Sequence, residues 1–215
     1  CGLSAQDDRV WCWDDATPAP FVHSETPFQW LHSNCALRRN DSRVQLLFDA
    51  TGAPDPGTPG PAMPFSRVAC TDAAWRNKHV DQARLWGCGL SLDARQMWCW
   101  RTWTAAPQLM LSTSTRFTHV ALDSGDNSYA CRACALDDQL VARCVDETGR
   151  LLFTSPGTLA IAATISEMVR VNALTLQLER HDGSGWAVLS PGTQVLLPAE
   201  RFVVSAAAGE GDDAR

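Results

Sequence analysis

Short apolar segments alternate with polar, turn-forming segments along most of this chain. The clearest example occurs twice: residues 1–13 and 88–100 both begin with Cys-Gly-Leu-Ser, continue through variable residues and end with Trp-Cys-Trp. Two short apolar stretches around a polar centre are typical of a β-hairpin. The ungapped match at every fixed position predicts that hairpins repeat along the chain.

Three weaker copies follow the same plan. Residues 35–47 and 134–145 each contain a Cys-Ala-Leu strand followed by a second apolar strand, and residues 174–189 provide a version without cysteine. The centres of these hairpins contain residue types that favour turns. They are residues 6–8, 40–42, 137–138 and 182–185.

The spacing of the cysteines predicts which of them pair. In an antiparallel register in which Cys1 faces Cys12, and Leu3 faces Val10, the two sulfur atoms lie within bonding reach. The same register applies to the hairpin at residue 88, and a turn that is one residue shorter gives it at residue 134. The predicted disulfides are Cys1–Cys12, Cys88–Cys99 and Cys134–Cys144.

Three further cysteines remain after these pairs. One additional bridge, such as Cys70 with Cys131, would leave Cys35 or another cysteine single, and a single thiol could join a partner chain. The alternative is that all the cysteines are reduced and act as small buried apolar residues.

A second recurring segment precedes some of the hairpins. Residues 65–69, 117–121 and 202–206 each begin with Phe and end with Ala, and residues 21–23 are a candidate fourth copy. A period of roughly 40–50 residues that is built from short strands is typical of a β-propeller with one four-stranded blade per repeat. The predicted fold class is therefore all-β, a β-propeller of short antiparallel blades with disulfide-stapled hairpins.

We expect about five blades. Residues 202–206 could join the first hairpin in one composite blade and close the ring, or the five could belong to a longer ring. Residues 1–208 form a single propeller, or a propeller fragment, in this interpretation. A loop rich in Pro and Gly at residues 51–64 is expected to bulge from the surface, and residues 209–215 are expected to form an acidic flexible tail. Helix is expected almost nowhere, and the best helical stretch is residues 73–85.

The repeat resembles that of the regulator of chromosome condensation family. The resemblance lies in Phe-x-x-Val-Ala, then Cys-(Gly/Ala)-Leu, then an apolar residue before Cys-Trp. It is nearest to the cysteine-bearing extracellular branch, which includes plant crinkly-type receptor kinase ectodomains and bacterial β-lactamase inhibitor proteins. This resemblance implies a propeller, usually of seven blades, that presents loops on a disc-shaped face to another protein. The glycine that usually follows Cys-Trp is replaced by Asp14 and Arg101 in the two strong copies.

Charge and cysteine content restrict the partners and the compartment. The 215 residues carry 18 basic and 24 acidic side chains, a formal net charge of −6, so the chain has no electrostatic footprint for nucleic acid. No apolar stretch is long enough to cross a bilayer. Paired cysteines on adjacent strands are typical of an oxidising compartment. These features predict an extracellular or cell-surface protein that binds no nucleic acid and has no membrane span.

Two surface features are candidates for recognition. Trp13, Trp100 and Trp103 are a candidate binding surface, because exposed tryptophans stack on sugars or anchor protein contacts; packing between blades is the alternative. Asn40 begins the sequon Asn-Asp-Ser at a predicted hairpin tip, where an oligosaccharide could attach.

The sequence predicts no catalytic, cofactor or metal site. The pair Cys131-x-x-Cys134 lacks a second half at zinc-ligand spacing, and residues 123–127 lack the downstream glutamate of a calcium loop. His23 and His119 occupy similar repeat positions, which favours a packing role.

The predicted function is non-catalytic: an extracellular protein-interaction or structural assembly module, with protein partners and possible glycans. The alternatives are a carbohydrate-binding propeller that uses repeated Trp sites, a hydrolase with its site in the central channel, and a cytoplasmic scaffold with reduced thiols.

Overall fold

The structure is a computed structural model that describes residues 1–12, 21–33, 35–47, 60–71, 85–103, 105–123, 132–163, 168–181 and 184–189. Within these ranges the chain forms five small antiparallel sheets, and no helix occurs among the described elements. The all-β prediction is therefore confirmed. The segments at 51–59, 72–84, 124–131 and 190–215 lie outside the described residues, and with them most of the predicted loop, the candidate helix, the calcium-like turn and the closing strand.

Each sheet is a meander in which strands that follow one another in sequence are hydrogen-bonded neighbours. The first sheet contains β1 (Gly2–Leu3), β2 (Val10–Cys12) and β3 (Phe21–Ser24), and the second contains β4 (Phe28–His32), β5 (Cys35–Arg38) and β6 (Val44–Leu46). The third contains β7 (Arg67–Cys70), β8 (Gly87–Leu90), β9 (Gln96–Trp100) and β10 (Gln108–Ser112). The fourth contains β11 (Phe117–Asp123), β12 (Arg132–Asp137), β13 (Ala142–Asp146) and β14 (Leu151–Ser155). The fifth contains β15 (Thr158–Ala163), β16 (Met168–Asn172), β17 (Leu178–His181) and β18 (Trp186–Val188).

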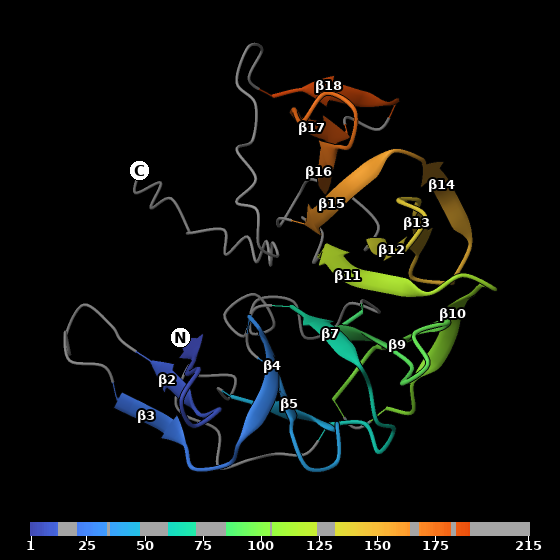
Figure 1. Cartoon of the computed structure of the whole chain (residues 1–215). Coiled ribbons are helices and arrows are strands. Elements are labelled where there is room, and N and C mark those ends of the chain that lie inside the picture. Colours follow the sequence, from blue (N-terminus) through green and yellow to red (C-terminus); the bar gives the residue numbers. More distant parts are fainter. Residues whose placement is uncertain are drawn as a thin grey trace, which may run out of the picture.

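Consecutive sheets contact each other mainly through their first strands. Strand β4 contacts β7, β7 contacts β11, and β11 contacts β15, while β11 also reaches β8 in the sheet before it. Figure 1 shows the sheets following one another in chain order around a common centre, with β4, β7, β11 and β15 on the inner side. Strand β1 contacts β4 in the way that β8 contacts β11, so it corresponds to the second strand of the other sheets.

One backbone hydrogen bond recurs at each junction between described sheets. The amide of a residue at the start of a sheet donates to the carbonyl of a turn residue in the preceding sheet, and every such turn residue has a positive φ. Three of the donors are the first residues of β4, β11 and β15, and the fourth, Phe65, lies two residues before β7. The four bonds are Phe28 to Asp8 (2.6 Å), Phe65 to Ser42 (2.8 Å), Phe117 to Ala94 (2.6 Å) and Thr158 to Leu140 (2.9 Å). Because the bond repeats, the four turns lie on the same side of the molecule, which we call the turn face.

The three predicted hairpin disulfides are present. Cys1 is bonded to Cys12, Cys88 to Cys99, and Cys134 to Cys144, with Cα separations of 3.9, 4.0 and 4.1 Å. The predicted register is also found, since Leu3 faces Val10 and the cysteines of the other two pairs face each other directly.

The prediction of a Cys70–Cys131 bridge is wrong, because Cys70 is bonded to Cys35. Cys35 occupies the same position in its hairpin as Cys88 does in the third sheet, but the residue opposite it is Leu46 rather than a cysteine. It therefore reaches the end of β7 in the next sheet, at a Cα separation of 6.1 Å. This bridge joins two sheets, whereas the other three lie within one hairpin.

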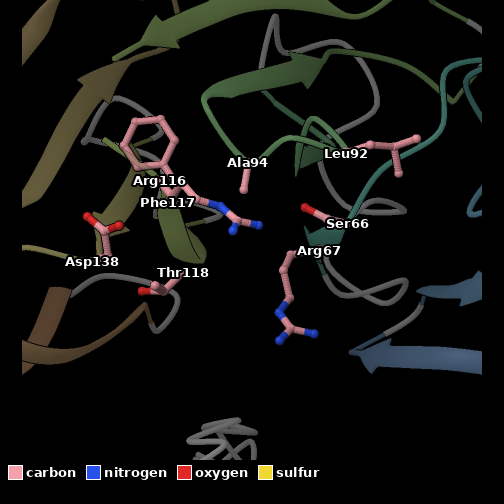
Figure 2. Close-up of a pocket in the computed structure, with 8 residues that line it drawn as sticks. All are labelled: Ser66, Arg67, Leu92, Ala94, Arg116, Phe117, Thr118 and Asp138. Atoms are coloured by element: carbon pink, nitrogen blue, oxygen red, sulfur yellow. The ribbon is translucent and has the colours of Figure 1, made fainter. Parts of the chain in front are cut away.

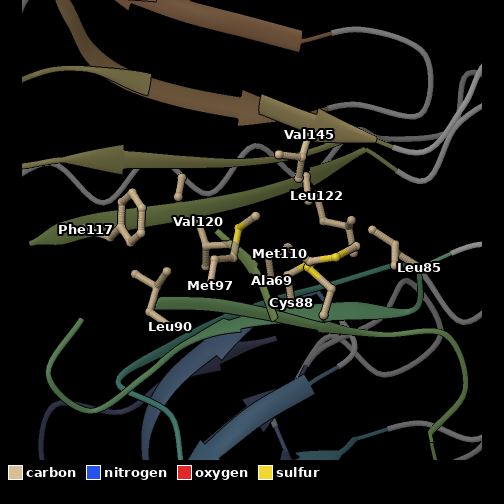
Figure 3. Close-up of a cluster of buried hydrophobic side chains, with 13 residues drawn as sticks. Ala69, Leu85, Cys88, Leu90, Met97, Met110, Phe117, Val120, Leu122 and Val145 are labelled. Carbon is tan, nitrogen blue, oxygen red and sulfur yellow. A yellow bond between two sulfur atoms is a disulfide. The ribbon is translucent and has the colours of Figure 1, made fainter. Parts of the chain in front are cut away.

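The core lies between the sheets. Figure 3 shows the cluster between the third and fourth sheets, where Met97 and Leu90 face Val120. A second cluster, between the second and third sheets, contains Phe65 and Trp100, whose ring centres are 5.5 Å apart. Glycine is required at position 89 because a Cβ there would lie 2.4 Å from the Phe65 ring.

Two expectations about individual segments are wrong. Residues 21–23 belong to β3, the third strand of its sheet, and the strand equivalent to β7 and β11 is β4. The segment at 174–177 forms the turn before β17 and leaves Leu174 91% exposed, so the cysteine-free hairpin equivalent to the others is β16–β17. Of the Pro/Gly loop only residues 60–64 are described; there Pro61 is buried and the Gly60 amide donates to the Val44 carbonyl (2.9 Å), so the bulge of the loop stays a prediction.

Candidate functional site

The turns of the turn face are fixed by side-chain hydrogen bonds. In three of them an aspartate precedes the positive-φ residue and accepts the amide of the arginine that follows. A left-handed backbone is unfavourable for residues other than glycine, and this type of contact compensates locally. The three segments are Asp7-Asp8-Arg9, Asp41-Ser42-Arg43 and Asp93-Ala94-Arg95. This recurring Asp-x-Arg was present in the sequence but was not used in the predictions above.

These contacts also favour the charged form of the aspartates. A hydrogen bond from the Ser91 hydroxyl, together with the Arg95 amide, lowers the pKa of Asp93. In the fourth sheet, burial alone would raise the pKa of Asp137, but hydrogen bonds from Arg143 and the Val141 amide lower it. The turns are therefore charged and ordered at neutral pH.

A hollow of about 400 Å³ opens between the third and fourth sheets on this face. Its walls come from the start of β7, the β8–β9 turn, the start of β11 and the β12–β13 turn. The lining residues are Ser66, Arg67, Leu92, Ala94, Arg116, Phe117, Thr118 and Asp138. Figure 2 shows the guanidinium groups of Arg67 and Arg116 extending into this hollow, with the Arg116 group directed away from Asp138.

Arg67 is held in place by an aromatic neighbour. Its guanidinium carbon lies 4.1 Å from the centre of a Trp30 ring, and the indole nitrogen of Trp30 donates to the Val68 carbonyl (3.0 Å). The Trp30 ring also meets His119 edge to face at 6.2 Å. Trp30, Arg67 and His119 each lie two residues after the phenylalanine whose amide donates to the preceding sheet, so the repeat brings these equivalent positions together.

The prediction that His119 shares its repeat position with His23 is therefore wrong. His23 lies on β3, which has a different place in its sheet.

The two histidines near the centre are neutral at physiological pH. Burial, and then repulsion from the protonated form of His119, lowers the pKa of His32 to about 4, and the Nδ1 of His32 accepts the Cys70 amide (3.3 Å). Burial, and then the positive charge of Arg67, also lowers the pKa of His119. The positive charge around the hollow therefore comes from arginine.

The hydroxyl groups of the hollow donate to backbone carbonyls. Ser66 Oγ donates to the Ser91 carbonyl (2.8 Å), and Thr118 Oγ1 donates to the Leu136 carbonyl (3.2 Å). Neither hydroxyl is hydrogen-bonded to a histidine or a carboxylate, which an activated nucleophile requires. Among the described side chains that line the hollow, Arg116 has a guanidinium group with no described hydrogen-bond or ion-pair partner.

The predicted tryptophan surface is not found at its described positions. Trp100 is fully buried and Trp103 is 5% exposed, and both pack in the cluster between the second and third sheets. They cannot form an exposed stacking surface for a sugar or a protein. Trp98 and Trp100 lie on one side of β9 and Cys99 on the other, since they join different clusters. Trp13 lies outside the described residues.

The remaining candidate residues have different outcomes. Asn40 is exposed in the turn between β5 and β6, so its glycosylation stays a prediction. Cys134 is bonded to Cys144, which removes it from the Cys131-x-x-Cys134 pair, and Cys131 is not described. Within the described ranges no cluster of His, Cys, Asp and Glu could hold a metal ion. The same part of the chain contains no helix with the length and apolar character needed to span a membrane.

Sequence reasoning missed Arg67 and Arg116. The signal for Arg67 was its place two residues after a repeated phenylalanine, and Arg116 directly precedes another. Their convergence depends on how adjacent sheets pack, which the repeat pattern alone did not specify. A comparison with models of protein families finds none that matches this chain, and a comparison with curated proteins finds no significant match.

Proposed function

We propose that this chain is a non-catalytic, extracellular protein-interaction module whose five sheets are blades of a β-propeller. Two observations favour the propeller: the first strands of successive sheets lie against one another, and the same turn-to-strand hydrogen bond recurs at four junctions. Radial repetition of this kind protects the edges of small sheets. The four disulfides are typical of proteins in an oxidising compartment and favour secretion.

The observation that carries the function is the preordering of the turn face. Its turns use non-glycine residues at positive φ, held by aspartate contacts, and in the first and third sheets a disulfide connects the two strands behind the turn. A surface that is already ordered loses little conformational entropy on binding, so it can bind a partner at low cost. Charged side chains of both signs at the turns would provide specificity.

The test is selection of binders from a displayed library of extracellular protein domains on the full, oxidised chain. Each binder is then measured against Arg95→Glu, on the turn face, and against the control Arg150→Glu, at the opposite end of the fourth sheet. Both arginines are exposed and each follows an aspartate-stabilised turn. We expect Arg95→Glu to weaken binding by about tenfold or more while Arg150→Glu leaves it unchanged. Binders that respond equally to the two changes, or only to Arg150→Glu, would contradict the proposal.

A further inference from the structure

The hollow on the turn face contains two guanidinium groups that come from different sheets. Arg67 lies at the start of β7 and Arg116 immediately before β11, and both extend into the same space of about 400 Å³ (Figure 2). Because the two positive groups line one hollow, an anion that enters it is attracted by both.

Arg116 has no anionic partner in the described part of the chain. No carboxylate there lies within ion-pair distance of its guanidinium, and its side chain makes no hydrogen bond to the described residues. Most of the other arginines on this face are engaged, as Arg9 is with Glu25 (2.8 Å) and Arg39 with Asp8 (2.6 Å). A guanidinium group without an ion-pair partner can bind a carboxylate through two parallel hydrogen bonds.

The remaining lining limits what can enter. The Ser66 and Thr118 hydroxyls donate to backbone carbonyls, so they offer no extra donors to a ligand. Leu92 is 58% exposed at the rim, while Ala94 and Phe117 supply a buried apolar floor. A ligand with a short aliphatic stem and one anionic end would contact the apolar floor with its stem and the guanidinium groups with its charge.

We propose that this hollow is a carboxylate-binding site that receives an acidic side chain of the protein partner. The inference rests on the proposed function, because it names the chemistry by which that partner is recognised. Arg67, already stacked on Trp30, is preordered for the contact. Arg116 supplies the charge that the described chain leaves unpaired. Bidentate arginine–carboxylate contacts provide both strength and orientation.

The test is an NMR titration of the full ¹⁵N-labelled chain with the capped tripeptide acetyl-Gly-Glu-Gly-amide and with its glutamine counterpart. Arginine Nε–H signals report directly on the guanidinium groups. We expect the glutamate peptide to shift the Arg116 signal and to bind at least about tenfold more tightly than the glutamine peptide, since charge-assisted hydrogen bonds are roughly twice as strong as neutral ones.

Two variants provide the matched comparison. Arg116→Ala should weaken the glutamate peptide about tenfold, and a thermal unfolding curve checks that it folds, as expected for an exposed side chain without described contacts. Arg150→Ala removes the same charge from the opposite end of the fourth sheet, away from the hollow, and should change the affinity less than about twofold. Equal loss in both variants would assign the effect to the overall charge of the protein and overturn the proposal.

Two further outcomes would also overturn it. One is equal affinity for the glutamate and glutamine peptides. The other is tighter binding of inorganic phosphate than of the glutamate peptide, which would make the hollow a phosphate site. If library binders depend on Arg95 but not on Arg116, and the peptide does not bind, only the carboxylate assignment fails. If the peptide binds and no protein binder is found, it is the protein-interaction proposal that fails.

Discussion

The junction between the second and third sheets differs from the junction between the fourth and fifth. The former has an inter-sheet disulfide, Cys35–Cys70, and a fully buried Trp100 between Phe65 and Trp103. The latter has no cysteine from the fifth sheet, and its polar centre is Arg170, which is paired with Glu179 at 2.7 Å. Arg170 also donates to the Ser155 hydroxyl and lies 4.5 Å from a Trp186 ring centre.

The two junctions show that equivalent positions of one repeat can be stabilised by different chemistry. The hairpins can be aligned by the hydrogen bond that closes their turns, from the Ser91 amide to the Gln96 carbonyl and from the Asn172 amide to the Gln177 carbonyl. In this alignment Val169 and Arg180, which face each other, correspond to Cys88 and Cys99. Position 89 must be glycine, because a larger side chain would collide with the Phe65 ring. The equivalent residue of the fifth sheet is Arg170, whose side chain occupies the space between the fourth and fifth sheets. The strand arrangement is the same at both junctions, while the side chains that connect the two sheets differ.

Removal of the tryptophan at each junction should give the largest contrast. Trp100→Ala opens a cavity in a closed cluster and should lower the free energy of unfolding by about 3–5 kcal/mol. Trp186→Ala removes a half-buried ring and should cost about 1–2 kcal/mol. Urea unfolding at neutral pH measures both. Equal losses would mean that the two junctions are packed alike.

The inter-sheet disulfide should stabilise more than a hairpin disulfide. The Cys35–Cys70 bridge closes a separation of 35 residues and the Cys88–Cys99 bridge one of 11. In the chain-entropy treatment, the double change Cys35→Ala/Cys70→Ala should therefore cost about 4 kcal/mol and Cys88→Ala/Cys99→Ala about 3 kcal/mol. Thermal unfolding of the two double variants gives the order, and the reverse order would contradict this account.

A disulfide can be introduced where the fifth sheet lacks one. Val169→Cys/Arg180→Cys places two cysteines at a directly facing pair of β16 and β17. We expect the bridge to form in air, and the oxidised variant to be about 2–3 kcal/mol more stable than the same variant with that bridge reduced. Mass spectrometry after thiol alkylation checks the bond. Free thiols at both positions would break the proposed equivalence of the hairpins.

The histidine beside the inter-sheet disulfide should make stability depend on pH. Because His32 is neutral in the folded protein with a pKa of about 4, the unfolded chain, with a histidine pKa near 6.5, takes up the proton first. Stability is then full above about pH 6.5 and falls by about 2 kcal/mol as the pH drops from about 7 to 4.5.

The control for this pH effect is His32→Asn, which keeps an acceptor for the Cys70 amide. The variant should lose most of the pH dependence across the same range while remaining stable at neutral pH. Urea midpoints between about pH 4.5 and 7 measure it. An unchanged pH slope in the variant would assign the dependence to other groups.

The sequence predicted the hairpins well and their junctions poorly. The register of Cys1–Cys12 and Cys88–Cys99 followed from local alternation, because facing positions in a hairpin depend only on the turn between them. The partner of Cys35 could not be found in this way, since Cys70 lies in another sheet. The burial of Trp100 was weighed as an alternative, and the structure selects it.

The candidate site shows the same division. Asp-x-Arg turns are local, so their recurrence could have been recognised from the sequence alone. The approach of Arg116 to Arg67 depends on the packing of β11 against β7, which connects residues far apart in the chain. Neither arginine has a feature that marks it separately from the other arginines of the chain.

The amino-acid sequence by itself determined the all-β class, the cysteine-bearing hairpins and three of the disulfides, because neighbouring positions are constrained by backbone geometry and alternation. Tertiary structure decided which sheets touch, which cysteine crosses between them, which tryptophans are buried and which two arginines line the same hollow. These features depend on the distance and angle between sheets, and that packing is set by the combined volume of many side chains rather than by any one segment.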